Sequence, residues 1–185
     1  MEENAELERL TEQASNVLFF AQYYSSPHRP LPIEPEHILL ALLLVDPRLF
    51  QLVSPNGSAD VATISSELKA FNPTRRKPWL AAEPPPLSTS SQAVVASAAD
   101  ECRRLGHSCI GTEHLLLALI KSREPGSSGG HAPSRASVIL HQVGLTIERV
   151  TAEIQAGSIT PQEGQEGSHR LIGEGRSSDN PKMRK

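Results

Sequence analysis

The sequence predicts an all-α fold made of two pseudo-symmetric four-helix repeats. Two stretches are nearly the same, IEPEHILLALL at 33–43 and IGTEHLLLALI at 110–120. Aligning Glu36 with Glu113 gives an offset of 77 residues, and this offset also aligns Leu10 with Leu87. A similarity that persists at one fixed offset indicates a duplicated structural unit. No segment shows the sustained apolar–polar alternation of a half-buried strand.

The first repeat has the pattern of four helices. A residue that can cap a helix start, Thr11, precedes apolar residues at helical spacing: Ala14, Val17, Leu18 and Ala21. The prolines of SSPHRPLP end that helix, and a second begins near Pro35 and ends near Asp46, before Pro47. Because this second helix is apolar almost all round, we expect it to be buried. RLFQLV predicts a short third helix and SADVATISSELKAF a fourth.

The second repeat follows the same order. Ser88 or Thr89 caps its first helix, and Gly106 ends it. Thr112 is predicted to cap the helix EHLLLALIK, which places Glu113 in the first turn, where the helix dipole favours an acid. RASVILHQVG and TIERVTAEIQAG supply the last two helices.

Composition sets the expected boundaries. We expect a double-repeat domain over 1–156, with repeat one at about 8–71, a proline-rich linker at 72–87 and repeat two at about 88–156. Residues 157–185 are polar and glycine-rich, so we expect a disordered tail.

The bulk properties exclude several classes of partner. The formal net charge is −3, which gives no electrostatic reason to expect nucleic acid. No apolar stretch approaches the roughly 20 residues of a transmembrane helix, so no membrane partner is expected. The acidic start MEENAELERL lacks the pattern of a secretory signal, and Cys102 and Cys109 are too few for a disulfide framework. We therefore expect a cytoplasmic protein.

The second copy resembles a known family. RLGHSCIGTEHLLLALI at 104–120 and VILHQVGLTIERVTAEI at 138–154 are similar to the second repeat of the Clp N-terminal domain, the double four-helix module of ClpA-, ClpB- and ClpC-type unfolding ATPases. The resemblance covers about residues 8–156 and is closest to the ClpC type. The first copy departs from the pattern, because it has Glu34 and Pro35 where the family has Gly-Thr.

The resemblance implies binding and no catalysis. The chain contains no GxxxxGK[ST] loop, so we expect neither ATP binding nor hydrolysis, and no cofactor. In the family this module recruits substrates and adaptors for the attached ATPase. We therefore expect a non-catalytic module that binds substrates or adaptors for a Clp ATPase/protease system. The alternative is a structural accessory subunit that binds the ClpP core or a Clp ATPase.

Five residues are candidates for a ligand site. In ClpC-type domains the glutamates that match Glu36 and Glu113 help to bind phosphorylated arginine, and the matching hydroxyls here are Thr11 and Ser88. A carboxylate can pair with a guanidinium, while helix-start amides and a hydroxyl hold the phosphate. With Thr112 at the helix start and Ser88 expected nearby, the resemblance favours the second repeat. The alternative is that each glutamate only complements a helix dipole.

Histidine and cysteine residues offer a second, weaker candidate. His37 and His114 follow the two glutamates, and we expect them to hold the turn before each helix by hydrogen bonds. The spacing of Cys102, His107 and Cys109 does not match a standard zinc motif, so no metal site is predicted.

Overall fold

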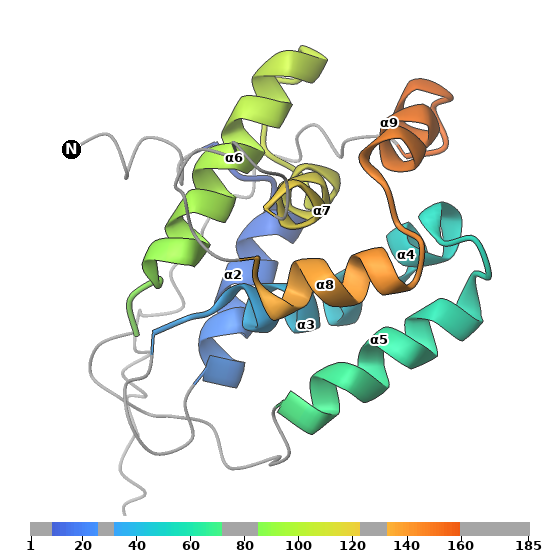
Figure 1. The fold of residues 1–185 in the computed structure, drawn as a ribbon. Coiled ribbons are helices and arrows are strands. Elements are labelled where there is room, and N and C mark those ends of the chain that lie inside the picture. The colour runs from blue at the N-terminus through green and yellow to red at the C-terminus, as the bar shows by residue number, and fades with distance from the viewer. Residues whose placement is uncertain (1–8, 26–31, 72–84, 123–132, 160–185) are drawn as a thin grey trace, which may run out of the picture.

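The computed structural model describes residues 9–25, 32–71, 85–122 and 133–159. Within these residues the chain forms eight helices and no strand (Figure 1). Repeat one contains α2 (Glu12–Ser25), α3 (Pro35–Val45), α4 (Pro47–Val53) and α5 (Ser58–Phe71). Repeat two contains α6 (Thr89–Leu105), α7 (Thr112–Lys121), α8 (Arg135–Gln142) and α9 (Ile147–Gln155). The all-α prediction with four helices in each repeat is confirmed.

The two central helices are the two copies of the repeated motif. In α3, Ile38, Leu39 and Leu42 are fully buried, as the all-round apolar pattern predicted. In α7, every residue from Thr112 to Ile120 is buried. Figure 1 shows α8 lying beside α3, so the core is shared between the repeats. None of the helices in the described residues is long and apolar enough to cross a membrane.

Short side chains fix where the helices begin. Thr11 Oγ1 accepts a hydrogen bond from the Ala14 N–H at 3.2 Å, and Ser88 Oγ accepts one from the Ser91 N–H at 3.2 Å, so both predicted caps are confirmed. The predicted cap at Thr112 is wrong. The N-cap of α7 is Gly111, because the Thr112 hydroxyl instead donates to Asp46 Oδ2, 2.9 Å away in the other repeat.

Two backbone bridges join the repeats with near two-fold symmetry. Leu10 pairs with Ile110, and Ile33 pairs with Leu87. Adding the offset of 77 to 10 and 33 gives 87 and 110, so one bridge is the symmetry equivalent of the other. The start of each repeat therefore lies against the turn before the central helix of the other repeat.

The C-terminal boundary differs in part from the prediction. Gly157 has a φ of 73°, a left-handed conformation that glycine adopts without strain, and it ends the α9 region. Ile159 still packs into the core with 9% of its surface exposed, so the fold continues past the predicted start of the tail at 157. The remaining predicted tail, 160–185, and most of the predicted linker, 72–84, lie outside the described residues.

Candidate functional site

The two repeated histidines hold the turns that precede α3 and α7. The Glu34 N–H donates to His37 Nδ1 at 2.9 Å, and the Gly111 N–H donates to His114 Nδ1 at 2.8 Å. Each ring satisfies a backbone donor that the helix start would otherwise leave unpaired. These bonds agree with the turn-holding role expected from the sequence.

The hydrogen bonds of His114 also determine its charge. Because Nδ1 accepts from Gly111, the proton of the neutral ring lies on Nε2, which is 2.8 Å from His107 Nδ1. Burial and the neighbouring His107 lower the pKa of His114 to about 4, with Glu101 acting in the opposite direction. His114 is therefore a neutral residue at pH 7 with both ring nitrogens engaged.

Glu113 is a buried acid with an unsatisfied oxygen. Its side chain is only 4% exposed, and Oε1 has no hydrogen-bond partner. Oε1 lies 3.2 Å from His114 Nδ1, but this nitrogen has no proton to donate because it already accepts from Gly111. Burial raises the pKa of Glu113, and the nearby Asp46 carboxylate adds to this rise, while hydrogen bonding to the Glu113 backbone and to Thr112 acts in the opposite direction.

Gly111 makes this position of Glu113 sterically allowed. A Cβ built at Gly111 would lie 2.6 Å from the Glu113 Cδ and closer still to both carboxylate oxygens. The reason for glycine here is contact and not backbone strain, since its φ is −97°. The carboxylate occupies the space that any larger residue would fill.

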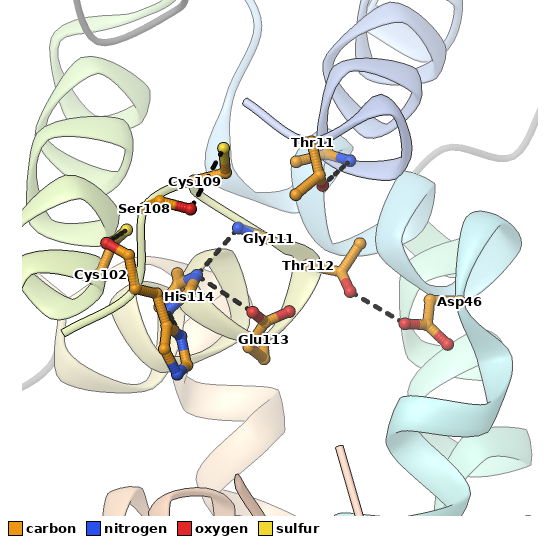
Figure 2. Close-up of polar contacts among 11 residues, drawn as sticks. Thr11, Asp46, Cys102, Ser108, Cys109, Gly111, Thr112, Glu113 and His114 are labelled. Carbon is orange, nitrogen blue, oxygen red and sulfur yellow. Dashed lines mark hydrogen bonds and ion pairs between the residues drawn. The ribbon is translucent and has the colours of Figure 1, made fainter. Parts of the chain in front are cut away.

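A cavity of about 240 Å³ lies between the repeats at this point. Figure 2 shows its central polar residues, with Thr112 placed between Glu113 and Asp46 and with Thr11 facing them. The residues that line it come from both repeats: Thr11, Gln13, Asp46, Arg48, Leu49, Leu52, Gly111, Thr112, Glu113, Ser158 and Ile159. It combines two carboxylates, two threonines and an arginine with an apolar wall.

The structure groups the predicted residues differently from the sequence-based expectation. Thr11 lies against repeat two, with its N–H donating to the Ile110 carbonyl oxygen at 2.9 Å. Ser88 lies against repeat one, with its N–H donating to the Ile33 carbonyl oxygen at 3.0 Å. Ser88 was expected near Glu113, and the symmetric bridges place its backbone against Ile33 and that of Thr11 against Ile110. The cavity brings together Thr11, Thr112 and Glu113, and Ser88 is not among its lining residues.

Glu36 has a different role from its counterpart Glu113. Its Oε1 accepts a hydrogen bond from the Ala136 N–H at 3.1 Å, at the start of α8 in the other repeat. Glu34 occupies the position in repeat one that is equivalent to Gly111 in repeat two. The Cβ of Glu34 therefore takes the space that corresponds to the one filled by the Glu113 carboxylate in repeat two. The Glu36 carboxylate is thus used in a hydrogen bond between the two repeats.

Sequence reasoning missed Asp46 and Arg48. Asp46 Oδ1 accepts from the Leu49 N–H at 3.1 Å and caps α4, while Oδ2 accepts from Thr112. The Asp-Pro pair at 46–47 is itself a helix-start signal that could have identified the cap. No local pattern shows that this cap faces Glu113.

Three side chains near the cavity bring ligand atoms within 4.8 Å of one another: His107, Glu113 and His114. A metal ion would have to replace one of the bonds made by the two nitrogens of His114, to Gly111 or to His107. Cys102 is also engaged, with Sγ donating to the His107 carbonyl oxygen at 3.2 Å. We assign no metal-binding role to this group.

Known proteins resemble this chain over most of its length. The family model for the Clp repeat (R) N-terminal domain matches residues 9–128. An uncharacterized protein of Mycobacterium tuberculosis is 29% identical over 154 residues, covering 83% of this chain and 55% of that protein. The chaperone protein ClpB of Oceanobacillus iheyensis is 28% identical over 161 residues, covering 86% of this chain. This chain spans about half the length of the mycobacterial relative and 18% of ClpB.

A solved structure shares the fold. The N-terminal domain of the caseinolytic protease associated chaperone ClpD from Arabidopsis thaliana aligns with a TM-score of 0.53 at 22% identity. The alignment covers 82% of this chain and 95% of the ClpD domain. With a family model that matches 120 of 185 residues (9 to 128), the chain belongs to the Clp repeat N-terminal domain family.

Proposed function

We propose that this chain is a non-catalytic module that binds substrate or adaptor polypeptides for a Clp ATPase/protease system. The observation that carries the proposal is the cavity between the repeats, which is lined by the Asp46 and Glu113 carboxylates together with the hydroxyls of Thr11 and Thr112. Carboxylates and hydroxyls at such a cavity can accept hydrogen bonds from the polar or cationic groups of a polypeptide. The family of the chain supports the same role, because its relatives include ClpB and ClpC chaperones.

The chemistry of the cavity favours binding over catalysis. The described residues that line it include no histidine or cysteine. The nearest histidine, His114, has both nitrogens engaged and a pKa lowered to about 4 by burial and by His107, so it is a poor general base. The Asp46 and Glu113 carboxylates that line it are instead suited to hold a guanidinium or an ammonium group. Thr11, Thr112 and Glu113 are the predicted site residues that we retain for this role, and phosphoarginine is the ligand that the family resemblance implies.

Affinity purification of the tagged full-length chain, followed by mass spectrometry, tests the proposal. We expect Clp ATPase subunits together with many unrelated client or adaptor proteins, and we expect Glu113→Gln to lose the clients. Recovery of ClpP without ATPase or clients would support the accessory-subunit alternative. Saturable binding of ATP at micromolar concentration would contradict the non-catalytic assignment.

A further inference from the structure

We propose that Asn56, in the turn between α4 and α5, is a site of spontaneous deamidation, and that two hydrogen bonds to Asp60 keep it unreactive while the turn is closed. The products are aspartate and isoaspartate, and the only other reactant is water. The reaction is independent of the proposed binding role, since Asn56 is not among the described residues that line the cavity.

The residue that follows Asn56 makes it the most reactive asparagine of the chain. The five asparagines are followed in turn by alanine, valine, glycine, proline and proline. Deamidation begins when the backbone nitrogen of the next residue attacks the asparagine Cγ. A side chain on that next residue hinders the attack, and proline prevents it because proline has no N–H. Gly57 has neither obstacle.

The reaction uses only the two residues and water. The Gly57 nitrogen gives up its proton and bonds to Asn56 Cγ, while the bond from Cγ to Nδ2 breaks and Nδ2 leaves, with that proton, as ammonia. Water then adds to one of the two carbonyl carbons of the resulting succinimide. Opening at one carbonyl gives aspartate and opening at the other gives isoaspartate. Both products carry a carboxylate in place of the amide.

In the closed turn both reacting groups are held by hydrogen bonds. Asn56 Nδ2 donates to Asp60 Oδ1 at 3.2 Å, and the Asn56 N–H donates to Asp60 Oδ2 at 2.9 Å. The Gly57 N–H, which has to lose its proton, donates to the Ser54 carbonyl oxygen at 3.2 Å. Asp60 is buried in the first turn of α5, so its carboxylate holds Asn56 in a fixed position.

Burial does not protect Asn56, because the residue is exposed to water. The turn that joins α4 to α5 lies at the edge of the fold (Figure 1). Segments of this kind open locally at a lower cost in free energy than the core. An opening that releases Asn56 from Asp60 and Gly57 from Ser54 frees the side chain and the attacking nitrogen together. The rate of deamidation should therefore follow the opening of this turn.

Deamidation then prevents the turn from closing as before. Each product replaces the Nδ2 donor by a carboxylate, which faces the Asp60 carboxylate and is repelled by it. The turn also contacts repeat two, since a Cβ built at Gly144 would lie 3.3 Å from Pro55 Cγ. A turn that stays open loosens this contact between the repeats as well.

Peptide mapping by mass spectrometry of the full-length chain measures the reaction. The wild type is incubated at neutral pH, folded or denatured in guanidinium chloride, and aspartate and isoaspartate are quantified at each of the five asparagines. We expect Asn56 to be the main site in both states. It should react at least about 10-fold more slowly in the folded protein, the equivalent of one hydrogen bond to a charged group. Asp60→Ala removes the acceptor and should raise the folded-state rate toward the denatured rate.

Two comparisons separate the turn from a general loss of stability. Glu36→Ala removes a hydrogen bond between the repeats and should leave the rate at Asn56 in the folded protein unchanged. Asn56→Asp, which mimics the aspartate product, should lower the midpoint of urea unfolding more than Asn56→Ala, which loses the donor without adding a charge. A cooperative urea transition verifies that each variant is folded. If Asp60→Ala does not fold, Asp60→Asn removes the charge of the acceptor and should also raise the rate.

Several outcomes overturn the proposal. Deamidation at other asparagines with none at Asn56 would refute the site. Equal rates at Asn56 in the folded and the denatured wild type would refute the protection, as would a rate in the Asp60 variants no higher than in Glu36→Ala. Equal urea midpoints for Asn56→Asp and Asn56→Ala would refute the repulsion between the product and Asp60.

Discussion

Replacing Glu113 by glutamine should make the protein more stable at neutral pH. The carboxylate is buried, and its Oε1 accepts no hydrogen bond, so the folded state carries a charge that water no longer solvates. Glutamine has nearly the same shape and no charge. The variant avoids the cost of burying a charge, so we expect it to be more stable than the wild type at pH 7 by an amount on the order of 1–3 kcal/mol.

The pH dependence of this difference gives a sharper test. Burial raises the pKa of Glu113 above its ordinary value of 4.5, with Asp46 adding to the rise. The folded protein therefore binds this proton more tightly than the unfolded chain. The stability of the wild type should fall as the pH rises from about 4.5 through the raised pKa, while the glutamine variant lacks this loss. The two proteins should be nearly equal in stability below pH 4.5 and should differ most at pH 7.

Urea denaturation of both proteins across this pH range measures the difference. Every other titrating group is common to the two proteins, so its contribution cancels in the comparison. A glutamine variant that is less stable than the wild type at pH 7 would refute the reasoning. It would mean that the Glu113 carboxylate makes a favourable interaction within the folded protein.

Three further results are expected. Gly111→Ala should push the Glu113 carboxylate out of the space it now fills and lower the free energy of unfolding in urea by about 1–3 kcal/mol. Unchanged stability would contradict the steric role of Gly111. Glu36→Ala removes the acceptor of the Ala136 N–H and should lower the free energy of unfolding by about 1–3 kcal/mol in urea denaturation, whereas a neutral result would mean that this inter-repeat bond contributes nothing. Burial and His107 lower the pKa of His114 from 6.5 to about 4. The His114 contribution to the free energy of unfolding should therefore decline by about 3 kcal/mol as the pH falls from 6.5 to about 4. A His114 imidazole that titrates near 6.5 by NMR would contradict the buried, neutral assignment.

Most of the fold could be predicted because its determinants are local. The helix α5 has the same bounds as the segment SADVATISSELKAF, and Gly106 ends α6 in a left-handed conformation with a φ of 75°. Prolines, caps and apolar spacing act within a few residues, so the sequence displays them directly. The fixed offset of 77 residues then implied two equivalent units.

The site was harder to predict because it is built from contacts between the repeats. Thr112 looked like a cap for its own helix, but its hydroxyl bonds to Asp46, 66 positions away in the sequence. Ser88 and Thr11 were assigned to the glutamates of their own repeats, although the bridges place each hydroxyl against the other repeat. Periodicity identifies which residues are buried, but it does not say which buried residues face each other.

One sequence difference between the two copies explains why Glu36 and Glu113 make different contacts. With glycine at 111, the Glu113 carboxylate folds back onto its own turn, where Oε1 lies beside His114 without a hydrogen-bond partner. With glutamate at 34, that space is closed, and Glu36 reaches across to the start of α8. The first arrangement buries a carboxylate with one oxygen unpaired, while the second adds a hydrogen bond between the repeats. The duplicated motif has thus separated into a copy whose glutamate joins the two repeats and a copy whose glutamate stays against its own turn.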